Sequence, residues 1–510
     1  MQHSNLLSVH EALSGKNVLI TGVTGFLGKS IVEKLLRQVS DIGQIYLLIR
    51  KGQSESAEIR CEEDVFSSSI FDVLRDERGA DFWKEKVTVV DGELTQRRLG
   101  MSQLAFDELG QELDMIINSA ASVNFREALD QALSINTLCL NNLCALSAVK
   151  GQADAATPVL QISTCYVNGF NRGFMREEVV SPATGLIPQL DDDLYDIQPL
   201  IASMQEKIQR IKDKGMNAYR TEQALIKLGI QQARKYGWND TYTFTKWLGE
   251  QLLLQHFDKK NLTFVRPSII EGTWSEPVKG WVEGVKVADA MIYAYAKGRV
   301  SVFPGDDRGI LDVIPVDLVA NAVILSAAQR MDYKGQYRIY QCCSGRTNPI
   351  QLRDFISLIQ DEAVENYRQY PKLFAGEPKE MFKTVSLDKF RLYMAGFKTA
   401  TWLKTSLGRL VGSKKATKQM QKAKTTAELA QIFGFYTAPK YRFDSFQLEQ
   451  LMIRFNREDR MKFDVQADQY DWSTYIREVH MPGLHRYALQ DKVERRAERE
   501  GKVVSIKKAA

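Results

Sequence analysis

Short apolar runs alternate with helical patterns through the first half of the chain. The run at 16–21 is followed by a glycine-rich turn and by a segment in which Leu27, Ile31 and Leu35 lie on one helical face. Runs of consecutive apolar residues are typical of parallel strands that are covered on both faces. The alternation therefore predicts an α/β fold, a Rossmann-like doubly wound parallel sheet. The strands are expected at 16–21, 45–50, 87–91, 115–119, 159–164 and 262–266.

The alternation is interrupted once and ends near residue 350. Residues 171–241, between the fifth and sixth predicted strands, begin as a loop and then become helical and charged. Beyond residue 350 the pattern is helical, without further strand–helix–strand units. We therefore expect a Rossmann-like domain over 1–349 that contains the insertion, a smaller helical C-terminal domain over 350–495 and a flexible tail over 496–510.

Composition narrows the class of protein. Of the residues, 44% are hydrophobic and 26% are charged, as in soluble folded proteins. The net charge of +5 is small, and no basic-aromatic motif predicts nucleic-acid binding. The six cysteines lack C-x-x-C spacing and there are five histidines, so we predict no metal site. The N-terminus lacks the apolar core of a signal peptide, and no uninterrupted apolar run reaches the about 18 residues of a spanning helix, which favours a cytoplasmic protein.

The turn after the first predicted strand carries three glycines. Gly22, Gly25 and Gly28 stand in the stretch TGVTGFLG, directly before an amphipathic helix. Small residues at such a turn let the backbone approach a pyrophosphate, and the helix N-terminus offers unpaired N–H groups and a positive dipole end. This arrangement predicts a dinucleotide site. The spacing G-x-x-G-x-x-G differs from the G-x-G-x-x-G of most dehydrogenases.

The end of the second strand indicates which dinucleotide is bound. An NAD site usually has a carboxylate there, which holds the adenosine ribose 2′-hydroxyl. This chain has Arg50 and Lys51 instead. Two cations favour a 2′-phosphate and therefore NADPH, although a solvated basic pair at a strand end is the alternative. The absent carboxylate favours NADPH.

A tyrosine and a lysine one helical turn apart indicate the chemistry. Tyr242 and Lys246 share one helix face. A phenol has a pKa near 10, and a nearby lysine cation would lower that pKa toward the range that proton transfer needs. Ser163 and Thr164 end the fifth strand, where a hydroxyl could hold a carbonyl oxygen beside the phenol. We therefore predict a reductase in which Tyr242 donates a proton.

These motifs together resemble those of the extended short-chain dehydrogenase/reductases. Within that superfamily the chain is similar to the alcohol-forming fatty acyl-CoA reductases, over about residues 15 to 490. The closer similarity lies in YLLIR, NSAASVNF, STCYVNG, YTFTKWLGE, VRPSII and IPVDLVANA, and in the tail in FDVQ, DWSTY and PGL. One departure is that the chain has Gly92, Glu93 and Leu94 where relatives commonly read G-D-L, which leaves the adenine contact there open.

The resemblance implies roles for particular residues. Tyr242 is expected to be the proton donor, Lys246 to bind the nicotinamide ribose and tune the tyrosine, and Thr164 rather than Ser163 to hold the substrate oxygen. Besides Tyr242 and Lys246, the expected cofactor contacts are Gly22, Thr24, Gly25, Phe26, Leu27, Gly28, Arg50, Lys51, Glu93, Leu94, Ala120, Ala121, Ser122, Pro267 and Ile269.

The resemblance also implies a reaction. It is the NADPH-dependent reduction of a long-chain acyl-CoA, or of an acyl carrier protein thioester, through a fatty aldehyde to a primary alcohol with release of CoA. The insertion and the C-terminal domain are expected to enclose the acyl chain. The alternatives are a reductase that stops at the aldehyde, a nucleotide-sugar epimerase or dehydratase, a non-catalytic NADPH sensor and a peripheral membrane scaffold.

One segment of the C-terminal half is strongly basic. Residues 389–427 contain ten basic residues and no acidic one, and apolar residues are interleaved in the first part. Such a segment could lie on an anionic bilayer, where each cation contributes about 1 kcal/mol. We therefore predict peripheral contact with an anionic membrane. Attraction of the CoA phosphates and a solvated basic face are the alternatives.

Overall fold

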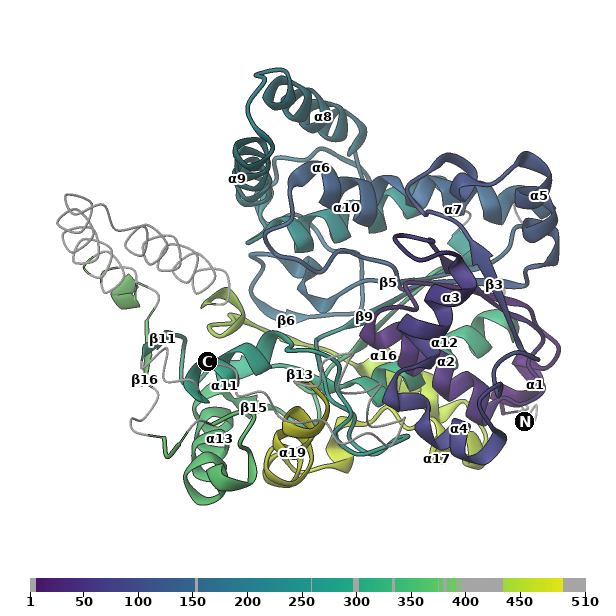
Figure 1. Ribbon diagram of the computed structural model, residues 1–510. Coiled ribbons are helices and arrows are strands. Elements are labelled where there is room, and N and C mark those ends of the chain that lie inside the picture. The colour runs from purple at the N-terminus through teal and green to yellow at the C-terminus, as the bar shows by residue number, and fades with distance from the viewer. Residues whose placement is uncertain are drawn as a thin grey trace, which may run out of the picture.

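The centre of the molecule is a seven-stranded parallel sheet (Figure 1). The computed structural model describes residues 6–488 except 152–154, 258, 297–301, 333–334, 375, 379–382, 387, 391, 393–395 and 397–433. The strand order is β14-β9-β5-β4-β1-β2-β3, and each neighbouring pair is parallel. The strands are β1 (Val18–Thr21), β2 (Ile45–Ile49), β3 (Val87–Asp91), β4 (Met115–Asn118), β5 (Val159–Ile162), β9 (Leu262–Pro267) and β14 (Arg338–Cys342).

The Rossmann-like doubly wound sheet that the sequence predicts is confirmed. All six expected strands belong to it. Their order places β1 beside β4, which is the topological switch point where the order of the strands along the sheet reverses. The sequence analysis missed β14. This strand lies at the sheet edge, and Arg338 and Gln341 interrupt its apolar run. The side-chain N–H groups of Gln341 donate to the carbonyl oxygens of Met175 and Asp444, both at 2.9 Å, so its burial does not leave these donors unpaired.

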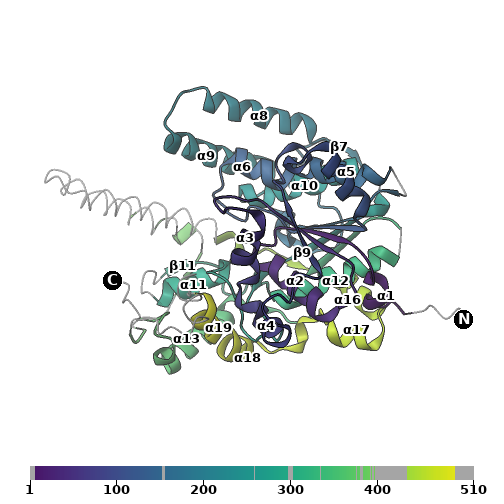
Figure 2. The same ribbon diagram turned by 45° about the vertical axis from the view of Figure 1, so that its right-hand side comes forward.

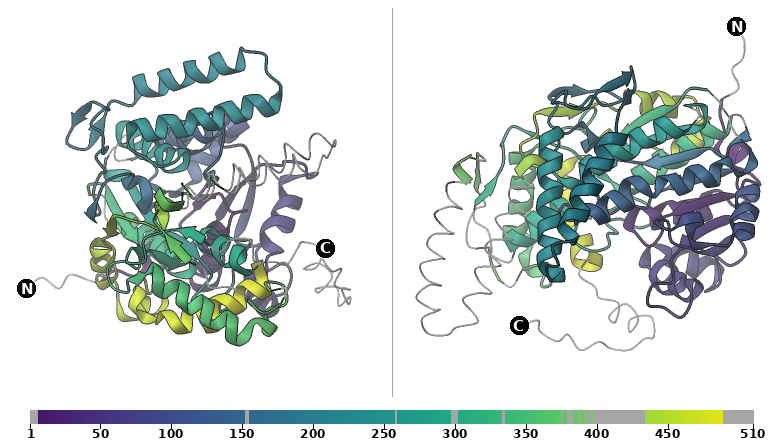
Figure 3. Two further views of the ribbon diagram at one scale, coloured as in Figure 1. Left: turned by 90° about the vertical axis from the view of Figure 1, so that its left-hand side faces the viewer. Right: turned by 90° about the horizontal axis from the view of Figure 1, so that it is seen from above.

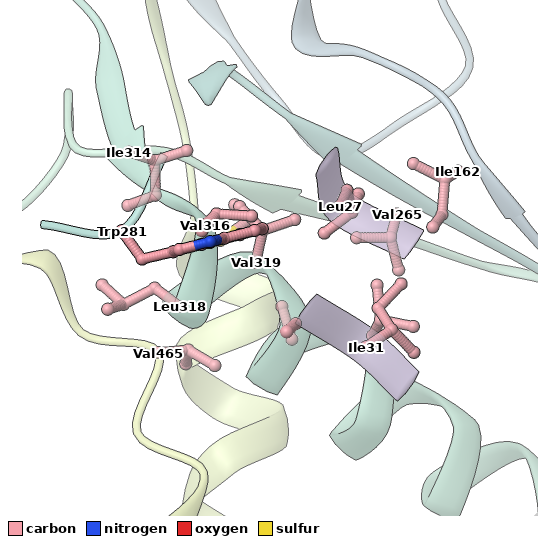
Figure 4. Close-up of a cluster of buried hydrophobic side chains, with 14 of the residues drawn as sticks. Leu27, Ile31, Ile162, Val265, Trp281, Ile314, Val316, Leu318, Val319 and Val465 are labelled. Carbon is pink, nitrogen blue, oxygen red and sulfur yellow. The ribbon is translucent and has the colours of Figure 1, made fainter. Parts of the chain in front are cut away.

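Helices cover both faces of the sheet. On one face, α2 (Phe26–Gln38) packs against α12 (Val316–Asp332), and Figure 4 shows their apolar side chains meeting those of β5 and β9. On the other face lie α10 (Thr241–His256), α5 (Gln103–Glu112) and α7 (Leu140–Ser147). Other described elements are α3 (Ala57–Cys61), α4 (Asp72–Arg78), β10 (Ile269–Glu271), α11 (Val287–Ala296), β11 (Val302–Pro304), β12 (Ile310–Leu311), β13 (Val313–Pro315), β15 (Ile350–Gln351), α13 (Leu352–Asn366) and β16 (Lys383–Val385).

The stretch between β5 and β9 contains a projecting helical hairpin. Three short strands come first in this stretch: β6 (Gly173–Met175), β7 (Gln189–Asp191) and β8 (Leu194–Tyr195). The hairpin itself consists of α8 (Gln198–Lys212) and α9 (Ala218–Tyr236). Figures 2 and 3 show α8 and α9 side by side, standing away from the sheet. Their inner faces bury Leu200, Ile201, Met204, Leu225 and Ile226.

The segment 441–462 packs into the same core as the sheet. β17 (Tyr441–Phe443) pairs in parallel with β6, and α16 (Phe446–Ile453) and α17 (Arg457–Lys462) lie beside α12 and α1 (Val9–Leu13) (Figure 1). One buried apolar cluster joins these segments to α2 and α12. The division at residue 350 stays a prediction. The membrane prediction for 389–427 falls largely outside the described residues, which omit 397–433.

One helical stretch is long and apolar enough to span a membrane, judged by its length and composition alone. In the described part of the chain this is Leu129–Lys150, which comprises α6 (Leu129–Leu133), a π-helical turn, α7 and a terminal 3-10 turn. Asn136, Asn141 and Asn142 interrupt its apolar residues, which is why the sequence shows no unbroken run. In the structure the stretch packs against α10, and Leu133, Leu140 and Leu143 contribute to the buried core.

Candidate active site

A cleft of about 840 Å³ opens at the carboxyl ends of β1, β4, β5 and β9. This is the edge of the sheet where doubly wound folds bind their ligands. The structure brings nearly all of the predicted site residues to it: Gly22, Thr24, Gly25, Phe26, Leu27, Gly28, Arg50, Glu93, Leu94, Ala120, Ala121, Ser163, Thr164, Tyr242, Lys246, Pro267 and Ile269 line the cleft.

Two predicted residues do not line this cleft. Lys51 lines a neighbouring hollow, which it shares with Arg50 and Glu93. Ser122 faces the protein, because its N–H donates to Asn136 Oδ1 at 2.9 Å and its hydroxyl donates to a carboxylate oxygen of Glu127 at 2.6 Å. A cofactor contact through the Ser122 side chain would require these bonds to rearrange.

The glycine turn has a shape that only glycine permits. Gly22 has φ +71°, and a Cβ there would lie 2.6 Å from the backbone N of Ala120. A Cβ on Gly28 would lie 2.5 Å from the carbonyl oxygen of Gly22. Gly25 is the N-cap of α2 and supplies no side-chain cap, and the first turn of α2 contains no acidic residue. The first N–H groups of α2 are therefore open to an anionic group, as a dinucleotide diphosphate requires.

The far end of the cleft carries two arginines. Arg50, at the end of β2, has a side chain that is 64% exposed, and its guanidinium lies 3.4 Å from the Glu93 carboxylate. Arg60 of α3 donates to the carbonyl oxygen of Arg50 at 2.6 Å and pairs with Asp64 at 3.0 Å. Arg60 lines both the cleft and the neighbouring hollow. The sequence analysis missed it, because only the fold of α3 back onto β2 brings it to this end.

The proposed reaction centre lies at the start of α10. Asp240 caps this helix by accepting the Thr243 N–H at 2.9 Å, so that Tyr242 and Lys246 face the cleft on successive turns. The Lys246 ammonium donates to the carbonyl oxygen of Ile162 at 2.6 Å. The Thr164 hydroxyl lies beside the Tyr242 phenol and donates to the carbonyl oxygen of Pro267 at 3.4 Å. Ser163 Oγ is buried and has no hydrogen-bond partner among the described residues, so this hydroxyl is available to a ligand.

Burial dominates the acid–base properties of this pair. It raises the pKa of Tyr242 above its ordinary value; the Asp240 charge raises this pKa further, and the neighbouring Thr164 hydroxyl lowers it. Burial lowers the pKa of Lys246 to about 8, against the opposing charge of Glu250. The sequence argument expected the Lys246 cation to lower the pKa of Tyr242. That expectation is wrong, because desolvation of the phenol raises its pKa and outweighs any effect of the cation.

Aromatic side chains border the reaction centre. The Phe125 ring lies edge-on to the Tyr242 ring at a centroid distance of 5.8 Å, and Tyr436 lies 5.1 Å from Phe125 and 4.7 Å from Tyr166. The Tyr436 hydroxyl donates to Asp240 Oδ2 at 2.7 Å, so the C-terminal part of the chain reaches the cap of the helix that carries Tyr242. Cleft residues that sequence reasoning did not assign include Arg60, Thr95, Asn124, Phe125, Tyr166, Ser268, Lys286 and Tyr436.

The fold and the cleft together define a Rossmann-type oxidoreductase with a site for a nicotinamide dinucleotide. Comparison with known proteins agrees. Residues 20–323 and residues 401–491 match two family models, the first of them NAD-binding, that are both described as "Male sterility protein". The chain belongs to the fatty acyl-CoA reductase family.

Two curated relatives illustrate the similarity. "Fatty acyl-CoA reductase 2, chloroplastic" of Arabidopsis thaliana is 32% identical over 507 residues, which cover 95% of this chain and 80% of that protein. "Alcohol-forming fatty acyl-CoA reductase" of Simmondsia chinensis is 29% identical over 504 residues, which cover 94% and 99%. Among solved structures, the terminal R domain of the myxalamid PKS-NRPS pathway superimposes with a TM-score of 0.54 at 18% identity, covering 92% of this chain and 90% of that chain; this likeness supports the fold.

Proposed function

We propose that this chain reduces a long-chain fatty acyl-CoA to a primary alcohol with NADPH as the reductant. The observation that carries the proposal is the cleft in which Tyr242, Lys246 and two hydroxyls lie beside a glycine turn suited to a dinucleotide. The names of the relatives supply the substrate class, since one is called a fatty acyl-CoA reductase and another an alcohol-forming one.

The side chains of the cleft account for the proton in each reduction. Bound NADPH supplies the hydride. The Ser163 and Thr164 hydroxyls would hold the carbonyl oxygen of the thioester or aldehyde, and Tyr242 would give its proton to that oxygen as negative charge develops. A neutral phenol is the form that burial favours, so the acid is in its proton-donating state at neutral pH. The Lys246 ammonium would stabilise the phenolate that remains after transfer.

The preference for NADPH rests on the cations at the adenosine end. A 2′-phosphate at the end of β2 would meet Arg50 and Arg60. The adjoining hollow is also lined by the carboxylates of Glu63, Asp64, Asp91 and Glu93, of which Asp64 lies 3.0 Å from Arg60 and Glu93 lies 3.4 Å from Arg50. Arginine recognises phosphate in a charge-assisted, often bidentate manner. Both arginines line the cleft, and both line the adjoining hollow that also contains Lys51.

Arg50→Asp is therefore expected to raise the Kd for NADPH by about tenfold or more, because hydrogen bonds to charged groups contribute about 1.5–3 kcal/mol, and to change the Kd for NADH by less than about threefold. Arg60→Gln should act in the same direction. Titration calorimetry with both cofactors measures this. Arg220→Asp, the same change at an exposed position of α9, is the control. Equal loss of NADPH and NADH binding in Arg50→Asp would contradict the assignment.

The end product distinguishes the proposal from its nearest alternative. Two successive reductions at one site require two NADPH oxidised for each CoA released, with alcohol as the product, and an added long-chain aldehyde should consume one NADPH. Absorbance at the NADPH band, a thiol assay for free CoA and chromatography of the lipid give the three quantities. A ratio of one with accumulating aldehyde would instead identify a reductase that stops at the aldehyde.

A further inference from the structure

A lysine that no sequence motif singled out lies over the glycine turn. Lys286, between β10 and α11, lines the cleft, and its Nζ lies 4.2 Å from the centroid of the Phe26 ring. Phe26 is the first residue of α2 and follows Gly25 directly. The ammonium of Lys286 therefore lies close to the helix N-terminus whose N–H groups are open to an anion.

The ion pairing of the Lys286 ammonium is unusual for a mostly buried lysine. Among the described residues no carboxylate lies within ion-pair distance of it, whereas Lys29 of α2 pairs with Glu283 at 2.5 Å. Burial lowers the pKa of Lys286, and the more distant charges of Glu271, Asp289 and Glu283 oppose this. The Phe26 ring offsets only part of the cost of burying such a cation. An anion in the cleft would supply the partner that the protein does not.

The loop that carries Lys286 is fixed without using the lysine side chain. The Lys286 N–H donates to Asp289 Oδ2 at 2.8 Å, and the Ala288 N–H donates to Glu271 Oε1 at 3.0 Å. Asp289 is held in turn by His480 at 2.8 Å, and all three of these acceptor and ring side chains are buried. Backbone bonds thus set the position of the loop, and the ammonium remains available to a ligand.

The geometry points to Lys286 as a binding residue for the diphosphate of the nicotinamide cofactor, which we propose is held between the N–H groups of α2 and this side-chain cation. The proposal rests on dinucleotide binding and not on the acyl substrate. Because NADPH and NADH share the diphosphate, Lys286 should contribute equally to both. This separates it from Arg50 and Arg60, whose contribution should depend on the 2′-phosphate.

Lys286→Met tests the proposal, because methionine keeps an unbranched apolar stem beside Phe26 and removes the charge. Loss of one charge-assisted contact of about 1.5–3 kcal/mol corresponds to a rise in Kd of about 10- to 150-fold, and we expect this for both NADPH and NADH. Quenching of tryptophan fluorescence in the absence of any acyl substrate measures both constants, since Trp281 stacks on Phe26 at 4.9 Å. Lys286→Arg should retain most of the affinity.

The chain offers a matched control. Lys279 lies in the same loop between β10 and α11 and also over an aromatic ring, that of Trp274 at 5.8 Å, but it does not line the cleft. Lys279→Met should leave both cofactor constants unchanged, and far-UV circular dichroism of the Lys286 and Lys279 variants verifies that each is folded. If Lys286→Met does not fold, Lys286→Gln takes its place.

Three results would overturn the proposal. Unchanged Kd values for both cofactors would exclude a diphosphate contact. A loss confined to NADPH would assign Lys286 to the 2′-phosphate. Unchanged cofactor binding with a raised KM for acyl-CoA would assign it to the phosphates of CoA. Because cofactor binding is measured without substrate, a failure here leaves the proposed reduction of acyl-CoA standing, and absence of that activity would leave the Lys286 result standing.

Discussion

Tyr242→Phe is expected to lower kcat for acyl-CoA reduction by about 10²- to 10⁴-fold, the usual contribution of a positioned general acid, while the Kd for NADPH changes by less than about threefold. The substitution removes one oxygen atom and leaves the ring in its edge-on contact with Phe125. The lost group is the phenol hydroxyl, which lies beside Thr164 and lines the cleft. Single-turnover kinetics with saturating NADPH separate the chemical step from cofactor binding.

A second tyrosine, Tyr195 of β8, packs against the same helix and provides the control. Tyr195 packs against Trp247 of α10 at a centroid distance of 5.7 Å, and its hydroxyl is bonded to Ser181 Oγ at 2.8 Å, away from the cleft. Tyr195→Phe removes the same atom from a buried ring and should leave kcat within about twofold of the parent, because Tyr195 does not line the cleft. The loss of its neutral hydrogen bond should lower the free energy of unfolding by only about 1 kcal/mol. Turnover in Tyr242→Phe close to that of the parent would remove Tyr242 from the role of acid.

The largest expected effect on stability concerns a buried ion pair behind the reaction centre. Glu250 follows Lys246 by one turn of α10, and its carboxylate accepts two bonds from Arg266 of β9, at 2.9 and 2.7 Å. The two side chains are 3% and 0% exposed. Glu250→Ala leaves the Arg266 cation buried without its partner, which should lower the free energy of unfolding by about 3–5 kcal/mol. Urea denaturation followed by circular dichroism measures this change.

Two further variants show whether the buried charge is the cause. Glu206→Ala breaks an exposed pair with Arg210 at 3.4 Å on α8 and should cost less than about 1 kcal/mol. The double variant Glu250→Leu, Arg266→Met removes both charges and should recover part of the lost stability. If Glu250→Ala and Glu206→Ala cost equal amounts, the buried pair does not hold α10 against β9 as the structure indicates.

The strands of the sheet were predictable because each is an apolar run with a local signature. Ile45–Ile49 and Met115–Asn118 are buried throughout, which makes the run continuous in sequence. β14 escaped prediction because Gln341 is polar, and its burial is explained only by partners at Met175 and Asp444, far away in the chain. The pattern of apolar residues thus predicted the strands whose side chains face apolar helices. It did not predict β14, in which the polar side chain of Gln341 is hydrogen-bonded to backbone groups far away in the chain.

The residues of the candidate site likewise fall into those that a sequence motif predicted and those that it did not. The glycine turn and the Tyr242–Lys246 pair are short motifs whose residues are brought together by one turn or one helix, and sequence alone located them. Arg60, Lys286 and Tyr436 reach the cleft through tertiary packing, without a motif of their own. The pKa of Tyr242 was also misjudged, because burial of the phenol depends on the whole fold and not on the spacing to Lys246.

The pairing of β17 with β6 has a consequence for biosynthesis. Gln447 and Leu448 donate their N–H groups to Glu177, across 270 and 271 residues of chain. A ribosome adds about 5–20 residues per second, so β6 waits for its partner for tens of seconds after it has been made. During that time its backbone edge is unpaired and can template association with other chains. Nascent chains of this protein are therefore most in need of a chaperone late in translation, after the sheet is complete but before β17 emerges.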